Sequence, residues 1–234
     1  MYICVALEFS ERSSPMKVYN IAIDGPSGAG KSTVAKLLAE KLGIMYLDTG
    51  ALYRTVGLKA MRSGWHEDND FVSGALASTD IKVKFENGVQ RMYLDGEDVT
   101  EAIRLPGVSD YGSRFSALPC VRSALLGLQR KAAEENSSVL DGRDIGTCVL
   151  PDAEYKFFLT ASVDNRAHRR YNELKAKGLD VNYDEIKADI TARDERDINR
   201  MVSPLRKADD AVEINSDYMT AEEVAKRIMA FIKK

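Results

Sequence analysis

The chain has 234 residues, of which 44% are hydrophobic and 29% charged, as is typical of a soluble globular protein. Its formal net charge of −3 gives no electrostatic basis for binding nucleic acid. No apolar run approaches the roughly 18 residues of a membrane-spanning helix, so we expect a chain that does not associate with a membrane.

Residues 1–15 precede the first clear structural signal. They have neither the basic start, nor the long apolar centre, nor the small-residue cleavage site of a signal peptide. Met16-Lys17 stands directly before the first predicted strand, so residues 1–15 are either an extension or the product of an upstream start codon that is not normally used. We expect this segment to be disordered and residues 16–234 to form one domain.

The segment 25–33 carries the strongest motif of the chain. It fits the phosphate-loop pattern G-x-x-x-x-G-K-[ST], follows an apolar run at 18–23 that predicts a buried strand, and precedes an amphipathic helix. Backbone N–H groups of such a loop surround phosphate oxygens, and the helix N-terminus adds partial positive charge. Lys31 would reach the β- and γ-phosphates, and the Ser32 hydroxyl would bind Mg²⁺. The motif predicts a nucleoside triphosphate bound by Gly25, Pro26, Ser27, Gly28, Ala29, Gly30, Lys31, Ser32 and Thr33.

Strand and helix signals alternate along much of the chain, which predicts an α/β fold with a parallel sheet flanked by helices. Strands are predicted at 18–24, 44–48, 138–141, 155–160 and 211–215. Helices are predicted at 31–42, 51–63, 120–135, 164–177 and 184–200. The capping box Thr220-Ala-Glu-Glu223 opens the last helix, whose core-facing residues are expected to be Val224, Ile228, Phe231 and Ile232.

The segment 81–94 interrupts this alternation. Its apolar and polar residues alternate about Asn87-Gly88, the strongest short signal for a β-hairpin. An antiparallel hairpin does not belong in a parallel α/β run, so residues of about 66–116 are predicted to form an insertion above the main sheet.

Two polar segments follow predicted strands. Ligands of open α/β sheets bind beyond the carboxyl ends of the strands. In Asp48-Thr-Gly-Ala-Leu-Tyr-Arg54, the arginine would lie one turn into the next helix, where a phosphate is favoured. The alternative is an ordinary surface arginine.

The second polar segment is Asp141-Gly-Arg-Asp-Ile-Gly146. An acidic residue just past a strand, here Asp141, can serve near Mg²⁺, and Arg143 offers a planar fork to a phosphate. Asp144 adds a carboxylate of the kind that accepts from the exocyclic amino group of cytosine. The alternative is a capped turn without a ligand.

The two charged helices carry arginines at helical spacing. Arg166, Arg169 and Arg170 share one face, and Arg193, Asp197 and Arg200 share another. Such stripes are often only solvated faces, but phosphoryl transfer needs cations around the phosphate and exclusion of water, which arginines on a mobile lid supply.

Together these segments resemble the bacterial cytidylate kinases of the nucleoside monophosphate kinase family, over residues 17–232. The most specific matches are the segments 23–31, 48–54, 140–147, 166–170 and 193–200, and among the features of the chain the segment 140–147 and the long hairpin insertion resemble this family most narrowly. The resemblance implies a P-loop NTPase-type fold with an inserted monophosphate-binding subdomain and a helical lid at about 162–202. It implies that ATP phosphorylates CMP and dCMP with Mg²⁺, in pyrimidine nucleotide metabolism.

The resemblance also implies roles for single residues. Arg54 and Arg143 match positions that hold the acceptor phosphate, and Arg200 matches one that clamps the transferring phosphate. Positions that read cytosine are matched by Ser113, Arg122 and Asp144, and positions that contact the sugar by Thr49, Arg193 and Asp197. The expected catalytic residues are Lys31, Arg143, Arg193 and Arg200. The chain departs from some relatives at Thr49, where they have serine, and at Ile198, which removes one lid cation.

Three other functions remain as alternatives: another small-molecule kinase such as adenylate or shikimate kinase, a nucleotide-switched GTPase, and a nucleic-acid ATPase motor. The Asp141–Gly146 segment favours cytidylate over the first. No N-K-x-D segment supports the second, and length and charge argue against the third. Three widely spaced cysteines argue against a zinc site or disulfides. We therefore expect a cytoplasmic monomer that binds small molecules.

Overall fold

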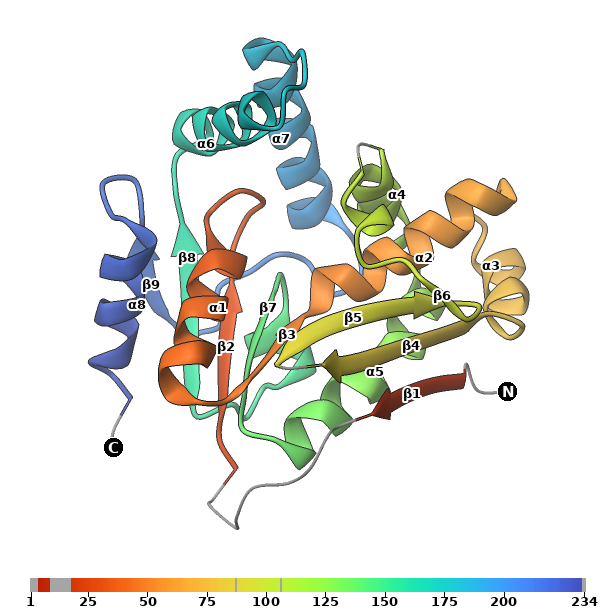
Figure 1. The fold of residues 1–234 in the computed structure, drawn as a ribbon, viewed down its shortest axis with the longest axis horizontal. Helices are drawn as coiled ribbons and strands as arrows, with labels where there is room; N and C mark the ends of the chain where they lie inside the picture. Colours follow the sequence, from red (N-terminus) through yellow and green to blue (C-terminus); the bar gives the residue numbers. More distant parts are fainter. Residues whose placement is uncertain (1–3, 9–17, 87, 106, 233–234) are drawn as a thin grey trace. The chain divides into compact units, whose positions relative to one another are not determined.

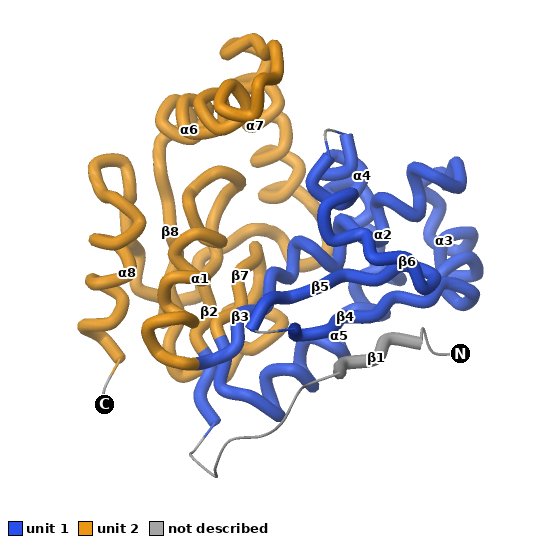
Figure 2. Tube along the Cα trace, in the orientation of Figure 1, with its two compact units in different colours: residues 1–20, 44–138 blue, residues 21–43, 139–234 orange. Residues whose placement is uncertain are grey.

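The computed structural model describes residues 4–8, 18–86, 88–105 and 107–232, the first of these ranges by its backbone alone. The chain divides into two compact units, shown in Figure 2. Unit 1 comprises residues 1–20 and 44–138, and unit 2 comprises residues 21–43 and 139–234. In the described part of the chain, no helix is long and apolar enough to cross a membrane.

The main sheet is parallel and has the strand order β3-β7-β2-β8-β9. Strand β2 (Asn20–Asp24) pairs with β8 (Tyr155–Thr160), which pairs with β9 (Val212–Asn215). Helices flank the sheet, so the expected α/β fold is confirmed (Figure 1). The other elements of unit 2 are α1 (Lys31–Leu42), β7 (Ser138–Gly142), a π-helical turn (Ile145–Val149), α6 (Val163–Ala176), α7 (Tyr183–Asn199) and α8 (Ala221–Met229).

Local signals set the ends of the unit 2 helices. Gly43 ends α1 in a left-handed conformation, from which its N–H reaches the carbonyls of the last turn. The predicted capping box is present at Thr220, whose side chain accepts from the N–H of Glu223 while the glutamate accepts in return. Val224 and Ile228 of α8 are buried as expected. Phe231 is half exposed, contrary to expectation, because α8 ends at Met229 and the helical face ends with it.

Unit 1 is built around the predicted hairpin. Strands β4 (Asp80–Glu86) and β5 (Val89–Leu94) pair antiparallel, with Ile81 opposite Leu94, so the hairpin expectation is confirmed. The other elements of unit 1 are β1 (Cys4–Glu8), β3 (Met45–Asp48), α2 (Thr49–Ser63), α3 (Asn69–Leu76), β6 (Glu97–Asp98), a 3₁₀ turn (Ala102–Arg104), α4 (Val108–Phe115) and α5 (Pro119–Glu135).

Part of the N-terminal segment is a strand. Residues Cys4–Glu8 form β1, which pairs parallel with β4 from Asp80 to Lys84. This differs from the disordered extension expected over residues 1–15. The physical reason is that β4 pairs with β5 on one side only, and its second edge can take a further strand from an apolar segment. The rest of that extension lies outside the described residues.

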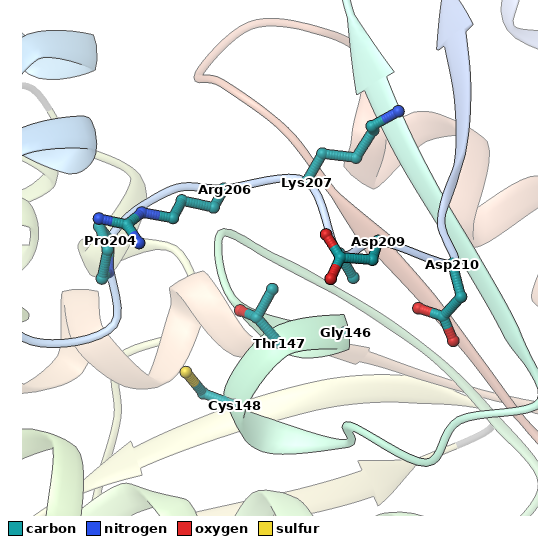
Figure 3. A pocket seen from close by; sticks show the side chains of 9 residues that line it. Gly146, Thr147, Cys148, Pro204, Arg206, Lys207, Asp209 and Asp210 are labelled. Carbon is teal, nitrogen blue, oxygen red and sulfur yellow. The ribbon is translucent and has the colours of Figure 1, made fainter.

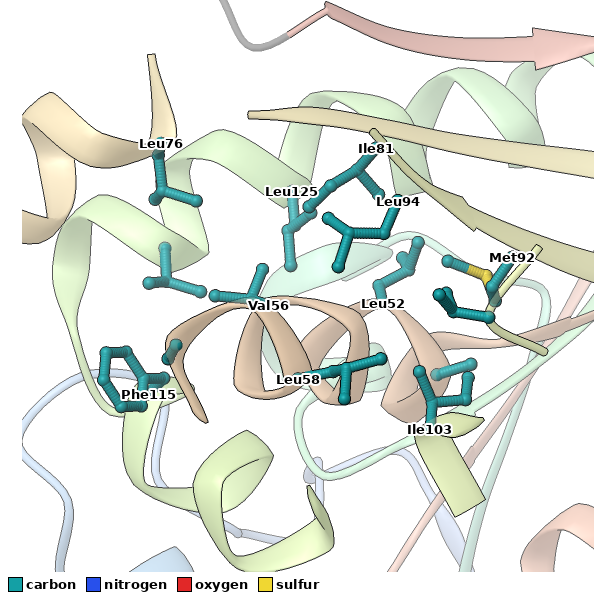
Figure 4. Close-up of a cluster of buried hydrophobic side chains, with 14 of the residues drawn as sticks. Leu52, Val56, Leu58, Leu76, Ile81, Met92, Leu94, Ile103, Phe115 and Leu125 are labelled. Atoms are coloured by element: carbon teal, nitrogen blue, oxygen red, sulfur yellow. The ribbon is translucent and has the colours of Figure 1, made fainter. Parts of the chain in front are cut away.

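The core of unit 1 surrounds α2. Leu52 and Val56 of this helix are buried together with Ile81 and Leu94 of the hairpin (Figure 4). Helix α4 adds Phe115, which is also fully buried.

Helices α2 and α4 pack with their backbones in close approach. A Cβ atom added at Gly57 of α2 would lie 2.4 Å from the backbone nitrogen of Gly112 in α4. Backbone atoms cannot rotate away as a side chain can, so no larger residue fits at Gly57 without moving a helix.

We predict that Gly57→Ala lowers the stability of the chain by several kcal/mol, since overpacking against backbone costs about 1–3 kcal/mol or more. Gly127→Ala is the matched control, because Gly127 also lies inside a helix but its added Cβ would meet no atom within 4 Å. The control should raise stability by about 0.5–1 kcal/mol. Denaturant unfolding of both variants measures the effect, and equal changes for the two would contradict the close approach of α2 and α4.

Candidate active site

The loop between β2 and α1 has the backbone that a phosphate loop requires. Gly25 has a φ of +146°, and a Cβ added there would lie 2.0 Å from the carbonyl oxygen of Leu159, so only glycine fits. Gly30 has a φ of +91° and stands directly before α1. The two glycines let the chain turn sharply from the strand into the helix, whose N-terminal N–H groups then face the loop.

Lys31 is buried at the start of α1, with 5% of its surface exposed. Its Nζ donates to the carbonyl oxygen of Pro26 at 2.7 Å, within the same loop. Burial lowers the pKa of Lys31 well below 10.5, and the positive charges of Arg143 and Arg193 lower it further. Cations are therefore crowded around this amine, as expected where an anion binds.

The hydroxyl of Ser32 is paired with a carboxylate from a distant part of the sequence. Ser32 Oγ donates to Oδ2 of Asp141 at 2.8 Å. Asp141 lies at the carboxyl end of β7 and is 4% exposed. Two residues that the sequence marked separately as candidates near Mg²⁺ are thus in contact.

Asp24, the last residue of β2, holds the Asp141–Gly146 segment in place. Its two carboxylate oxygens accept from the N–H groups of Ile145 at 2.8 Å and Gly146 at 2.7 Å. Burial raises the pKa of Asp24 to about 6 and outweighs these two hydrogen bonds, which lower it. Sequence reasoning missed this residue, although an acidic side chain directly before the glycine-rich loop was the available signal.

Two arginine–aspartate pairs lie close to this segment. Arg143 Nε donates to Asp197 Oδ2 at 2.7 Å, and Arg200 Nη2 contacts Asp144 Oδ1 at 3.3 Å. The Arg200 and Asp144 side chains are each 5% exposed. Burial by itself would raise the pKa of Asp197, but the guanidinium groups of Arg143 and Arg193 hold it below its ordinary value. Five of the predicted site residues are thus brought together in unit 2.

The two charged helices pack against each other through a small apolar cluster that includes Ala167 of α6 and Ile186 and Ile190 of α7. Their arginines do not form the uniform face that the spacing suggested. Arg166 is buried, whereas Arg170 is half-buried and pairs with Glu173 of its own helix. The reason is that α6 turns one side toward the phosphate loop and the other toward solvent.

Unit 1 carries the remaining candidates, two of them at the start of α2. Thr49 is its buried first residue. Arg54 forms an ion pair with Asp48, whose Oδ2 lies 2.7 Å from its Nη2, so it is not an ordinary surface arginine. Asp48 also caps α2 by accepting from the N–H of Ala51 at 2.9 Å. Burial would raise the pKa of Asp48, but Arg54 lowers it below its ordinary value.

Ser113 and Arg122 lie on α4 and α5 and are both buried. The hydroxyl of Ser113 finds no hydrogen-bond partner among the described residues. Arg122 donates to the carbonyl oxygen of Ser116 at 3.4 Å, and its guanidinium lies over the ring of Tyr53, 5.5 Å from the centroid. Both residues are candidates for contacts that a ligand would complete.

A pocket in unit 2 contains none of the predicted site residues (Figure 3). It is lined by Gly146, Thr147, Cys148, Pro204, Arg206, Lys207, Ala208, Asp209 and Asp210. Among the described residues, no group of three or more histidine, cysteine, aspartate or glutamate side chains could hold a metal ion by itself.

Known proteins match the chain over nearly its whole length. The model of a family described as cytidylate kinase matches residues 21–234. The cytidylate kinase of Geobacter sulfurreducens is 52% identical and is matched over 92% of each chain, and that of Caldicellulosiruptor bescii is 49% identical over 94% of this chain and 97% of its own. Among solved structures, shikimate kinase from Acinetobacter baumannii has a TM-score of 0.41 at 19% identity over 91% of each chain, a distant likeness that does not bear on the reaction.

We predict that Asp24→Asn changes the pH dependence of stability. Because the pKa of Asp24 rises from 3.8 to about 6 on folding, its contribution to stability is present below pH 3.8 and is lost as the pH rises through 6. At about 1.4 kcal/mol per pKa unit the whole effect is about 3 kcal/mol, and the free energy of unfolding of the variant relative to wild type should rise by about 2–2.5 kcal/mol between pH 4 and pH 7.

Urea unfolding across this pH range measures the Asp24 effect. Asp152→Asn is the control, because Asp152 is exposed and has no ion pair among the described residues. This control gives the effect of replacing an exposed aspartate, with which the Asp24→Asn difference is compared at each pH. A pH-independent difference for Asp24→Asn would show that this carboxyl group does not titrate near pH 6.

Proposed function

The chain belongs to the cytidylate kinase family, and we propose that it transfers the γ-phosphoryl group of ATP to CMP and to dCMP. Phosphorylation of CMP by a kinase follows from the family and from relatives about 50% identical over nearly the full chain. The use of ATP, the acceptance of dCMP and a place in pyrimidine nucleotide metabolism belong to the proposal.

One observation carries the proposal: Lys31 is buried within a phosphate loop and its pKa is lowered by its burial and by Arg143 and Arg193. A triphosphate would supply the negative charge that relieves this crowding. Phosphoryl transfer needs positioning and electrostatic stabilisation more than covalent chemistry from the protein. Buried cations held ready before reaction suit that need, because they require little reorganisation during transfer.

Mg²⁺ fits the residues present beside the loop. Ser32 and Asp141 contribute one hydroxyl and one carboxylate, hydrogen-bonded to each other, and hard cations prefer oxygen ligands of this kind together with substrate phosphates. We propose that these two residues hold the ion, directly or through water. When bound, it would neutralise charge on the phosphates.

In unit 2, two arginines that now pair with aspartates would also bind phosphate oxygens of the substrates. Arg143 and Arg200 pair with Asp197 and Asp144. A guanidinium has five donors in a planar fork, so each arginine can take a phosphate oxygen while it keeps part of its contact with aspartate. We propose that Arg143 holds the acceptor phosphate and that Arg193 and Arg200 stabilise charge on the transferring group.

The aspartates of these pairs would then hold the rest of the acceptor. We propose that Asp197 accepts from a sugar hydroxyl, shared with Arg193, and that Asp144 accepts from the amino group of cytosine. Uracil has a carbonyl oxygen in place of that amino group, which a carboxylate repels. Despite its burial, Arg143 and Arg193 lower the pKa of Asp197, so this carboxylate is ionised and able to accept.

In unit 1 the proposal assigns four residues. Arg54, held by Asp48 at the start of α2, would bind the acceptor phosphate, and Thr49 would contact the sugar. The hydroxyl of Ser113, which has no hydrogen-bond partner in the described part of the chain, and the guanidinium of Arg122 would contact the base. A buried polar atom without a partner is costly, so a ligand that supplies the missing hydrogen bond gains affinity.

We further propose that the chain acts as a cytoplasmic monomer without a nucleic-acid or membrane partner. The free thiols of Cys120 and Cys148 support a reducing compartment. Oligomeric state follows from sedimentation analysis with and without nucleotide.

A panel of acceptors tests the proposed reaction. With ATP and Mg²⁺, turnover should be fastest with CMP and dCMP, slower with UMP, and absent with AMP, GMP and shikimate. Lys31→Ala should lower kcat by about 10²–10³-fold with every acceptor, since one group that stabilises transition-state charge is typically worth about 3–4 kcal/mol. Its melting temperature serves as the control for folding. Equal turnover with all five nucleotides, or a fully active Lys31→Ala, would refute the proposal.

Base recognition is tested at Asp144. Asp144→Ala should reduce the preference for CMP over UMP, measured as the ratio of kcat/KM values, by about ten- to hundredfold, mostly by weakening CMP. Asp209→Ala is the matched control, because Asp209 is exposed and is not assigned to the site. If Asp144→Ala keeps the wild-type ratio, Asp144 does not read the base.

A further inference from the structure

Arg166 is a buried arginine whose role the reaction does not yet explain. Its spacing with Arg169 and Arg170 predicts a lid cation, but only 3% of its surface is exposed. A cation this deeply buried must have its charge and its N–H groups satisfied by the protein. Its contacts therefore indicate what it does.

The guanidinium of Arg166 joins three separate segments of unit 2. Nε donates to the carbonyl oxygen of Ala161, which follows β8, at 2.9 Å. Nη1 donates to the carbonyl oxygen of Ser27, in the phosphate loop, at 2.9 Å. The same Nη1 lies 2.6 Å from Oδ2 of Asp194 on α7. One planar group thus connects the main sheet, the phosphate loop and the second lid helix.

Helix α6 also lies directly on the loop. A Cβ added at Gly28 would be 3.2 Å from Cβ of Arg166, so a larger side chain there would press on the helix. One turn further along α6, Arg169 donates to both the hydroxyl and the carbonyl oxygen of Ser216, and it passes within 3.9 Å of a Cβ added at Gly30. Arg166 and Arg169 of α6 therefore both lie close to the phosphate loop.

Asp194 connects Arg166 to the residues proposed to hold the acceptor. It is 9% exposed, and among the described residues its Oδ1 has no hydrogen-bond partner, so the contact of Oδ2 with Arg166 is its principal compensation. On α7 it follows Arg193 directly and stands three residues before Asp197, so the three residues span little more than one turn. A shift of Asp194 would move both of these neighbours.

We propose that Arg166 is a positioning residue that couples the phosphate loop to α7, so that binding of ATP and binding of CMP strengthen each other. Its hydrogen bond to Ser27 makes its position depend on how the triphosphate holds the loop. Its ion pair with Asp194 fixes the positions of Arg193 and Asp197. This inference rests on the proposed function, because it needs ATP and CMP as the two ligands. Coupling of this kind is reciprocal: whatever factor ATP applies to CMP affinity, CMP applies to ATP affinity.

The experiment measures CMP affinity by calorimetry, with and without a non-hydrolysable ATP analogue and Mg²⁺. The ratio of the two Kd values is the coupling factor. We expect a factor of about ten or more in the wild-type chain, within the usual range for coupled sites. Arg166→Gln and Asp194→Asn should each reduce it toward one, and the double variant should reduce it no further than either single variant. In kinetics, the same variants should raise KM for ATP more than tenfold.

Two controls separate coupling from mere structural support. Lys177→Ala removes a positive charge from the end of α6, where Lys177 is exposed and pairs only with Glu173 among the described residues, and it should keep the wild-type coupling factor. Arg166→Lys retains one donor near Ser27 and Asp194 and should restore part of the coupling that Arg166→Gln loses.

Several results would overturn the inference: a coupling factor of one in the wild-type chain, an unchanged factor in Asp194→Asn, or variants that lose melting temperature but keep the wild-type factor. If Arg166→Gln does not fold, Asp194→Asn decides alone, because it keeps the side-chain volume and an oxygen acceptor for Arg166. Failure of the proposed function has a different signature, namely no ATP-dependent phosphorylation of CMP by the wild-type chain.

Discussion

The rest of unit 2 depends on one constraint: cations buried at the carboxyl ends of the parallel strands must each have a carboxylate within reach. Arg143 has Asp197, Arg200 has Asp144, and Arg166 has Asp194. Removing a charge from water costs several kcal/mol unless an opposite charge and well-formed hydrogen bonds compensate. Asp197 lies on α7 and Arg200 directly follows that helix, and the two pair with Arg143 and Asp144 of the segment after β7, whereas Arg166 and Asp194 join α6 to α7. The end of β7 and the two charged helices are thus interdependent parts of one electrostatic arrangement. The positive charge of Lys31 is the least compensated of these buried cations, and its burial together with the nearby arginines lowers the pKa of Lys31.

The same ion pairs would keep the arginines oriented before the proposed, highly charged substrate binds. Each aspartate compensates the charge of a guanidinium that would otherwise repel the neighbouring cations. In the proposed assignment, a phosphate would compete for donors that are already oriented, so little side-chain entropy would be lost on binding. Asp24 contributes differently, since it holds two backbone N–H groups and fixes the segment that carries Arg143 and Asp144. Orientation of the site is therefore set by the backbone, and charge balance by the side chains.

Local sequence signals predicted much of this arrangement. The glycine-rich loop, the Asn87-Gly88 hairpin and the Thr220 capping box depend on neighbouring residues, and all three are present apart from Asn87 itself, which lies outside the described residues. The partnership of Ser32 with Asp141 spans 109 residues, and no local pattern encodes it. The short helices α3 and α4 were missed because eight residues give too little periodicity. Arg166 was assigned to the wrong environment for a related reason: helical spacing shows which residues share a face, but not what that face packs against.

The contact between α2 and α4 has a consequence for substrate size. A Cβ added at Gly112 would lie 3.0 Å from Cα of Arg54, so the backbones of the two helices touch where one carries Arg54 and the other, at the next position, carries Ser113. In the proposed assignment Arg54 binds the phosphate of the acceptor and Ser113 contacts its base. The separation of their Cα atoms is set by this main-chain contact, which side-chain rotamers cannot change. In that assignment the glycine contact would fix the spacing of the two backbone positions that hold the acceptor, and no single substitution at Gly57 or Gly112 could change this spacing without moving a helix.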